Sequence, residues 1–443
     1  MPKIFRFYGG VHPSGNKNTE DFPSQRLDDF SQVEILLQQH IGPPCECAVK
    51  KGDLVHVGTL VGRAVHPMSV PIHASVSGTV TDKRYVVSAT GAPVEAVTIT
   101  SDGKYTLDPE IRPPVIHSRE DFLDAVRNAG IVGLGGASFP THVKLAPPKD
   151  KKPDVLLVNG AECEPYITSD YRQITEHPDD IVDGILAVLR WLQIPKAIIG
   201  VESNKHLGAQ ILKREINKRE KMEEVSLPVS VTTLKTIYPQ GAEKMFIYSL
   251  TGRKVPTGKL PHDVHVLVMN ITTLRVIGKY LKNGLPLVRR LLTLDGSALL
   301  TPGNVNVPIG ARIIDVIKAA GGLSSEPSKV LMGGAMMGVA LDRVDQGIIK
   351  ANNAILVFGE KEALVPSESV CIHCGRCLSV CPMRLVPTGI DRAAREQNRE
   401  ELSRYHVMDC IECGCCTYTC PAKRYLTQSI KTGKKVLRTE PGK

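Results

Sequence analysis

Near its C-terminus the chain reads Cys371-Ile-His-Cys374-Gly-Arg-Cys377-Leu-Ser-Val-Cys381-Pro382 and then Cys410-Ile-Glu-Cys413-Gly-Cys-Cys416-Thr-Tyr-Thr-Cys420-Pro421. Nine of the twelve cysteines of this 443-residue chain lie within these two runs. Disulfide scaffolds are typical of short secreted chains with cysteines throughout, whereas clustering at one end of a long chain indicates a metal. The sequence therefore predicts a metal-bearing domain in a reducing compartment.

Both runs fit the pattern C-x2-C-x2-C-x3-C-P of bacterial two-cluster ferredoxins, in which the fourth cysteine of each run ligates the other cluster. Zinc sites made of paired C-x2-C units would leave the repeated four-cysteine run unexplained. Cys415 falls between ligand positions, and His373 is expected to be a loop residue. The predicted ligands of two [4Fe–4S] clusters are, for the first, Cys371, Cys374, Cys377 and Cys420, and for the second, Cys410, Cys413, Cys416 and Cys381.

Residues 389–405 separate the two cysteine runs and carry apolar side chains at helical intervals, which predicts a helix there. More than 360 residues precede the runs, so the clusters serve a larger structure. At roughly 100–200 residues per domain, the length predicts three or four domains.

Four polar or glycine-rich patches mark the middle of the chain. The first, residues 130–144, is a glycine-rich turn after a helix that Ser118 would cap. The second, residues 155–170, is a strand-like run that ends in acidic residues, where α/β folds place ligands. Tyr238-Pro-Gln-Gly241-Ala242-Glu243-Lys244 and Val268-Met-Asn270-Ile-Thr272-Thr273 complete the set. Each patch alone is also compatible with a structural turn or a solvated loop, but together they predict one ligand site on an α/β scaffold.

This quartet resembles the flavoprotein fold of the NADH-binding subunit of respiratory complex I. The resemblance implies that FMN is contacted by Gly133, Gly135, Gly136, Lys144, Asn159, Glu162, Gly241, Ala242, Asn270 and Thr273. It places NADH over the flavin beside Phe139, Glu164 and Glu243. Two positions depart from the pattern, because Leu134 stands where the complex I subunit usually has arginine and Ala242-Glu243 replaces an acidic pair.

The flanking segments also resemble known modules. Residues 43–112 are similar to a lipoyl-type barrel-sandwich domain, although no lysine occupies the attachment turn. Residues 295–358 resemble the ubiquitin-like β-grasp (SLBB) module. We therefore expect an α/β multidomain chain with these segments: 1–42 N-terminal extension, 43–112 barrel-sandwich domain, 113–294 FMN/NADH domain, 295–358 SLBB module, 366–425 2[4Fe–4S] ferredoxin-like domain and 426–443 basic tail.

The whole arrangement resembles the RnfC family, the NADH-handling peripheral subunits of the Rnf membrane complex. The N-terminal Phe7-Tyr-Gly9-Gly10-Val-His12-Pro13 with Lys17, the flavin patches, the SLBB segment and the paired cysteine runs follow that family's order. The resemblance implies an oxidoreductase subunit of translocase type that exchanges hydride between NAD(H) and FMN and single electrons through the clusters. It would couple ferredoxin oxidation to NAD⁺ reduction and cation transport.

The implied partners are NADH, the membrane-bound and iron–sulfur subunits of such a complex and, indirectly, ferredoxin. The implied location is the cytoplasmic face of the membrane, through partners, since no stretch approaches the roughly 20 apolar residues of a spanning helix. The opening residues also lack the apolar stretch of a signal peptide. The formal charge of +9 favours solubility or an acidic partner, and no nucleic-acid motif accompanies it.

Two alternative functions remain open. One is a soluble cobalamin reductase of the propanediol-utilisation type, whose modules come in a different order with the flavin domain first. The other is a non-enzymatic iron–sulfur relay whose flavin site has decayed, which flavin absorbance would distinguish.

Overall fold

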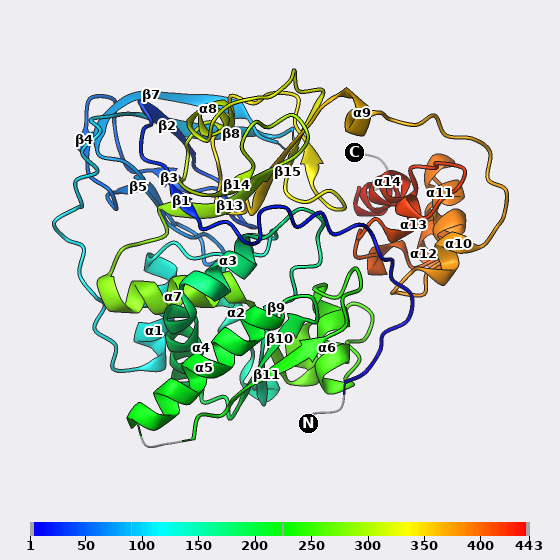
Figure 1. Ribbon diagram of the computed structural model, residues 1–443, viewed down its shortest axis with the longest axis horizontal. Coiled ribbons are helices and arrows are strands. Elements are labelled where there is room, and N and C mark those ends of the chain that lie inside the picture. The colour runs from blue at the N-terminus through cyan, green and yellow to red at the C-terminus, as the bar shows by residue number, and fades with distance from the viewer. Residues whose placement is uncertain (1–3, 90, 224–225, 440–443) are drawn as a thin grey trace.

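The computed structural model describes residues 4–89, 91–223 and 226–439. Four structural units build it, and the segment before residue 25 runs along their junction (Figure 1). Residues 1–3 of the predicted extension and 440–443 of the predicted basic tail lie outside the described residues. In the described parts of the chain, no helix has the length and apolar character needed to cross a membrane.

The first unit is a barrel sandwich of two small sheets. Their strand orders are β2-β8-β7-β4 and β3-β5-β6. Alternate residues such as Val33, Ile35, Val97 and Ile99 point into the shared core and are fully buried. The strands are β2 (Gln32–Leu36), β3 (Glu46–Cys47), β4 (Leu54–Val55), β5 (Leu60–Arg63), β6 (Ile72–His73), β7 (Gly78–Val87) and β8 (Pro93–Ser101).

The second unit is an α/β domain with a four-stranded parallel sheet of order β11-β10-β9-β12. Its central strands, β9 and β10, are apolar along most of their length, as expected where helices cover both faces. The strands are β9 (Val155–Gly160), β10 (Ala197–Glu202), β11 (Val229–Leu234) and β12 (Val266–Asn270). The helices are α1 (Arg119–Asn128), α2 (Thr141–Lys144), η1 (Lys149–Lys151), α3 (Ser169–Glu176), α4 (Pro178–Leu192), α5 (His206–Glu223), α6 (Glu243–Thr251), η2 (Pro261–Val264) and α7 (Ile271–Asn283).

The strand order places a topological switch point between β9 and β12. The chain moves outward from β9 to β10 and β11 and then returns to the other side of β9 with β12. Asn159 and Asn270 are register partners at the carboxyl ends of these two strands. In open α/β sheets such a crevice is where ligands bind. The predicted cap of α1 is confirmed, because the Ser118 hydroxyl accepts from the Asp121 amide and the Asp121 carboxylate accepts from the Ser118 amide.

The third unit is a six-stranded sheet of order β1-β14-β13-β17-β15-β16 that packs on α8. The antiparallel β13–β14 pair and the helix after it form the predicted strand–turn–strand–helix order. The elements are β1 (Gln25–Arg26), β13 (Arg289–Asp295), β14 (Gly303–Pro308), α8 (Ile313–Ala319), β15 (Lys329–Met332), β16 (Val339–Ala340), β17 (Ala354–Phe358) and α9 (Glu360–Ala363).

The fourth unit contains the two cysteine runs in two halves of the same backbone design. Gly375 and Gly414 both have positive φ and precede the short helices α10 (Arg376–Ser379) and α13 (Cys415–Tyr418). The longer helices α11 (Pro387–Arg395) and α14 (Leu426–Arg438) follow at equivalent positions and pack together. The remaining elements are α12 (Arg399–Arg404) and η3 (Val407–Asp409).

The helix predicted for residues 389–405 is in fact two helices. Gln397 adopts a positive φ of 53°, and the Asn398 side chain caps a new helix by accepting from the Glu401 amide. The apolar spacing is helical as predicted, but a local cap divides it. The break lets α12 fold back against α14, where Leu402 is fully buried.

Strand pairing and helix packing move three of the predicted boundaries. Residues Gln32–Leu36 precede residue 43 but pair with β8 in the barrel sandwich, because their buried alternate residues complete its core. Strand β13 begins before the predicted boundary at residue 295. It pairs with β14 on one side and with β17 on the other, and so belongs to the third unit. Helix α14 follows residue 425 but buries Leu426 and Ile430 in the cysteine-rich unit, so the described part of the basic tail belongs to that unit.

Candidate electron-transfer site

Two cavities in the fourth unit are each lined by one of the predicted ligand sets. The first contains Cys371, Cys374, Cys377 and Cys420, and the second contains Cys381, Cys410, Cys413 and Cys416. In each, three cysteines come from one run and the fourth from the other. This exchange of the fourth cysteine is the arrangement expected of a two-cluster ferredoxin, so the donor sets fit two cubane clusters.

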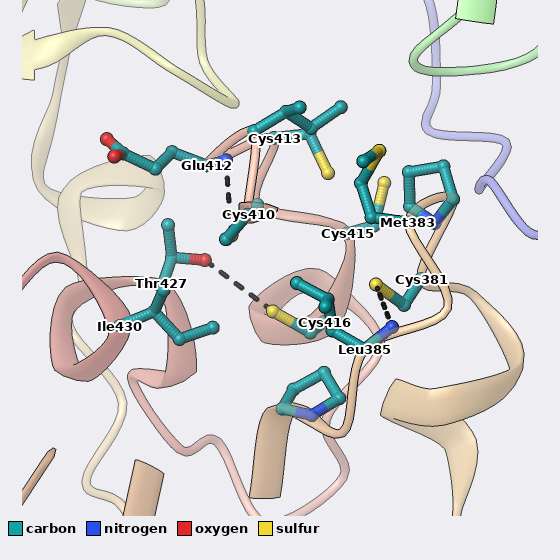
Figure 2. Close-up of a pocket in the computed structure, with 14 residues that line it drawn as sticks. Cys381, Met383, Leu385, Cys410, Glu412, Cys413, Cys415, Cys416, Thr427 and Ile430 are labelled. Carbon is teal, nitrogen blue, oxygen red and sulfur yellow. Dashed lines mark hydrogen bonds between the residues drawn. The ribbon is translucent and has the colours of Figure 1, made fainter. Parts of the chain in front are cut away.

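Figure 2 shows the second cavity and the hydrogen bonds that reach its sulfurs. The Leu385 amide donates to Cys381 Sγ at 3.4 Å, and the Glu412 amide donates to Cys410 Sγ at 3.3 Å. The Thr427 hydroxyl lies 3.8 Å from Cys416 Sγ. Hydrogen bonds to cluster sulfurs raise reduction potentials by stabilising the added negative charge, so these donors would tune the second cluster. Cys415 also lines this cavity, but its thiol lies 4.0 Å from the Tyr238 carbonyl oxygen.

The glycine-rich turn of residues 133–136 lies against the N-terminus of α7. The Leu134 amide donates to the Thr273 hydroxyl at 2.9 Å, and a Cβ on Gly135 would lie 3.4 Å from the Asn270 side chain. Gly136 has a φ of 106°, and a Cβ there would meet nothing within 4 Å. The turn therefore closes on α7 on one side and leaves open space on the other.

The two asparagines at the strand ends organise this edge of the sheet. Asn159 donates to the Gly241 carbonyl at 2.8 Å and accepts from the Ala161 amide. Asn270 caps α7 by accepting from the Thr273 amide and donates to Asp170 at 2.7 Å. The structure therefore brings the four sequence patches together at one edge.

The predicted cofactor residues also include an ion pair. Lys144 Nζ lies 2.6 Å from Glu243 Oε1, and both side chains are partly exposed. Ala242 is the residue before α6, whose first residue is Glu243. Phe139 lies in the turn itself, with its carbonyl accepting from the Gly133 amide.

Glu162 has its oxygens directed toward α3 and not toward open space. It accepts from the Asp170 amide at 2.6 Å and from the Tyr171 amide at 3.4 Å. Burial raises the pKa of this carboxyl to about 8, although Lys17 acts in the opposite direction. Its part in this structure is to close the turn between β9 and α3.

Glu164 joins the α/β domain to both C-terminal units. Its carboxylate accepts from the Tyr238 hydroxyl at 3.2 Å and from the Met336 amide at 3.0 Å. The same Tyr238 hydroxyl lies 2.8 Å from the Cys413 carbonyl oxygen, so its single hydrogen is shared between the two acceptors. Burial raises the pKa of Glu164. One buried tyrosine thus spans from the acidic turn to a ligand loop of the second cluster.

Sequence reasoning did not give Lys17 and Tyr238 individual roles. Lys17 Nζ donates to the carbonyls of Glu162, Glu164 and Ile167 at 2.6–2.8 Å and so shapes the acidic turn. Burial lowers the pKa of Lys17. Both residues appear in the quoted motifs, but their partners lie more than 70 positions away along the chain.

Several polar atoms at this edge have no hydrogen-bond partner among the described residues. These buried atoms are Ser138 Oγ and Thr141 Oγ1 at the glycine-rich turn and Ser169 Oγ at the start of α3. Buried polar groups are normally paired, so unpaired ones beside an open glycine turn are what a phosphate-bearing cofactor would satisfy. The residues present fit FMN.

Family models match four successive parts of the chain. They are the RnfC barrel sandwich hybrid domain at residues 5–104, the Nuo51 FMN-binding domain at 126–279, the SLBB domain at 291–340 and the 4Fe-4S dicluster domain at 363–421. Over 435 residues the chain is 44% identical to a subunit of the Na(+)-translocating ferredoxin:NAD(+) oxidoreductase complex of Acetobacterium woodii. That alignment covers 97% of this chain and 96% of the relative.

The chain belongs to the RnfC family. It is also 42% identical to a subunit of the proton-translocating ferredoxin:NAD(+) oxidoreductase complex of Clostridium ljungdahlii, over 97% of this chain and 93% of that one. The predicted family and the predicted order of barrel-sandwich, flavoprotein-like, SLBB and ferredoxin-like domains are confirmed. As an RnfC-family member with FMN-binding and iron–sulfur domains, the chain is an electron-transfer subunit.

Among solved structures, the fold is similar to that of an NAD+-reducing [NiFe]-hydrogenase in the air-oxidized state. The TM-score is 0.52 at 20% identity, over 66% of this chain and 55% of the hydrogenase chain. At this identity the likeness concerns the fold alone.

Proposed function

We propose that this RnfC-family chain handles NAD(H) in an ion-translocating complex and passes electrons between a flavin site and two [4Fe–4S] clusters. Bound FMN would exchange hydride with NAD(H) and single electrons with the clusters. The relatives' names describe ferredoxin:NAD(+) oxidoreductase complexes that translocate sodium ions or protons. By that relation this chain is the subunit at the NAD end, and it reaches the cytoplasmic face of the membrane through membrane-bound and iron–sulfur partners.

The contact of Tyr238 with both Glu164 and Cys413 carries this proposal. It connects the acidic turn predicted to lie beside NADH to the loop that lines the second cavity. Met336 lies between the acidic turn and the loop of the second cavity. Its amide donates to Glu164, and its carbonyl oxygen would lie 3.0 Å from a Cβ added to Gly414. The second cluster is therefore the one adjacent to the flavin site, and the first is the one remote from it.

The first cavity lies nearer the solvent. Cys374 is exposed, and the neighbouring Val370 and Ile372 are 83% and 65% exposed. Exposed apolar side chains next to a cluster ligand suit the docking of another electron carrier. We propose that electrons pass from the flavin site to the second cluster, then to the first and on to a partner protein.

The first experiment is anaerobic purification with iron, acid-labile sulfide and FMN determinations, followed by addition of NADH under visible and EPR spectroscopy. The proposal predicts about eight irons per chain. It also predicts one FMN that NADH bleaches. Full iron with no FMN, even after reconstitution, would leave a non-enzymatic relay as the better account.

Glu164→Gln tests the nicotinamide side of the site. We expect FMN and iron contents to stay close to those of the parent protein, because the amide keeps the shape of the side chain. Reduction by NADH should fall by at least about tenfold, the effect of losing one charged hydrogen-bond acceptor. Exposed Glu326→Gln is the matched control and should reduce as fast as the parent. Equal rates in all three proteins would remove Glu164 from the nicotinamide site.

A further inference from the structure

Apart from the two cysteine-lined cavities, a cavity of about 360 Å³ lies between the barrel sandwich, α7 and β13. In Figure 1 these elements meet on the side of the α/β domain away from the cysteine-rich unit. None of the predicted cofactor residues lines it, and it meets the glycine-rich turn only at Leu134. Its size lies within the range of roughly 300–1,000 Å³ of small-molecule sites.

The lining of this cavity is cationic. Arg26, Arg275, Lys279 and Arg289 contribute to it, and no Asp or Glu does among the described residues. The nearest carboxylates pair with only part of this charge. Asp28 lies 2.7 Å from both Arg26 Nε and Arg289 Nη1, and Asp180 Oδ2 lies 3.5 Å from Arg275 Nε. Arg290 also lines the cavity, so five cations and two ion-paired carboxylates leave an excess of positive charge around it.

Two of the cations have hydrogen-bonding capacity to spare. Arg275 Nε is buried and has no hydrogen-bond partner among the described residues. Among the same residues, the Lys279 ammonium group has neither a hydrogen bond nor an ion pair. Burial lowers the pKa of Lys279, Arg275 lowers it further, Asp180 raises it, and Arg26 and Arg289 add smaller decreases. The positive charges around the cavity therefore repel one another, which is unfavourable unless an anion lies between them.

A neutral side chain at the cavity wall also lacks a partner. Gln173 is only 4% exposed, and its Oε1 makes no hydrogen bond with any described residue. A buried primary amide normally uses its oxygen and its nitrogen. The amide of Asn306 also lies in the lining, so the wall has a neutral donor as well as charged ones, while the Ser75 hydroxyl donates to the Ile309 carbonyl.

From this geometry we infer that the cavity is a binding site for a phosphate-bearing anion, separate from the flavin site. Guanidinium groups match the oxygens of phosphate with paired N–H donors, and a dianion offsets the uncompensated charge of the wall. None of the residues predicted to hold FMN lines this cavity, and the fully buried Leu134 is where it meets the glycine-rich turn.

The test uses the anaerobic holoprotein loaded with FMN, so that the flavin site is occupied. The probes are radiolabelled inorganic phosphate and pyrophosphate in equilibrium dialysis, at constant ionic strength set with chloride. We expect saturable binding of one anion per chain and a higher thermal unfolding midpoint in its presence.

Lys279→Gln and Arg275→Gln should each weaken this binding by at least about tenfold. The control Lys213→Gln removes one exposed charge from α5, far from the cavity, and should bind as the parent does. FMN and iron contents report whether each variant is intact. If Arg275→Gln fails to fold because Asp180 loses a partner, Lys279→Gln still decides the question. No saturable binding by the parent protein, binding that survives Lys279→Gln, or equal weakening by Lys213→Gln would each overturn the inference.

Discussion

At the scale of single residues, Glu202 at the end of β10 has an unusual environment. It is 1% exposed, and neither carboxylate oxygen has a hydrogen-bond partner among the described residues. Burial raises the pKa of this carboxyl to about 7, against the opposing effects of Lys17 and Lys205. A carboxyl with these surroundings favours its protonated form in the folded chain.

Stability should therefore depend on pH through Glu202. Because its pKa is higher in the folded chain than its ordinary value of 4.5, its favourable contribution is complete below pH 4.5 and is lost as the pH rises through about 7. Glu202→Gln should remove up to about 3 kcal/mol of this dependence. Thermal unfolding of the anaerobic holoprotein across this pH range, with exposed Glu46→Gln as the control, measures it. Parallel pH profiles for the parent and Glu202→Gln would contradict the assignment.

Position 134 has leucine in place of a positive charge, and a neighbouring arginine supplies that charge. The complex I resemblance predicts an arginine at this position. The structure has a fully buried arginine beside it instead, because Arg290 from β13 donates to the Leu134 carbonyl at 2.6 Å. Burial lowers the pKa of Arg290 to about 10, so it remains a cation at neutral pH. The positive charge behind the glycine-rich turn thus comes from another structural unit.

At the scale of elements, the two cysteine runs form one unit of two interlocked halves. Each run lines one cavity with three cysteines and the other cavity with its fourth. The helices α11 and α14 pack against each other and hold the halves in this register. Losing one fourth cysteine should therefore affect the cluster of the opposite run.

EPR spectroscopy of serine variants can test this exchange of ligands. Cys381→Ser should change the signal of the same cluster as Cys416→Ser, because both residues line the second cavity. Cys420→Ser should change the same signal as Cys371→Ser. Iron loss from the affected cluster is expected to be partial, since three thiolates remain. If Cys381→Ser and Cys371→Ser altered one common cluster, each run would hold its own cluster alone.

At the scale of the whole molecule, the N-terminal segment fastens the cysteine-rich unit to the α/β domain. The Gly10 amide donates to the Val380 carbonyl at 2.9 Å, and Val11 forms a two-bond bridge with Tyr238. Arg384 lies over the ring of Tyr8 at 4.9 Å. The N-terminal segment thus contacts both the α/β domain and the cysteine-rich unit, between which electrons would pass. Figure 1 shows its path along these two units.

Gly9→Ala should loosen this junction. Gly9 has a φ of 75°, and an added Cβ would lie 2.7 Å from the Val380 carbonyl oxygen. The control Gly103→Ala has a similar φ of 72° but no atom within 4 Å of the added Cβ, so it carries the backbone strain of roughly 1–2 kcal/mol without the clash. We expect faster hydrogen exchange in residues 5–13 and slower reduction of the clusters by NADH in Gly9→Ala alone. Identical behaviour of the two variants would argue against a role for the junction.

The cap of α1 and the spacing within each cysteine run followed from the amino-acid sequence, because each depends on residues a few positions apart. The order of the domains followed from the resemblance of successive segments to known modules. The boundaries of the sheets did not, since β1, β2 and β13 pair with strands that the chain reaches much later or earlier. The contact of Tyr238 with Cys413 joins residues 175 positions apart. The cationic cavity likewise gathers residues from β1, α7 and β13. Such contacts arise only when separate units pack together, so no local pattern could have predicted which cysteine-lined cavity lies beside the acidic turn.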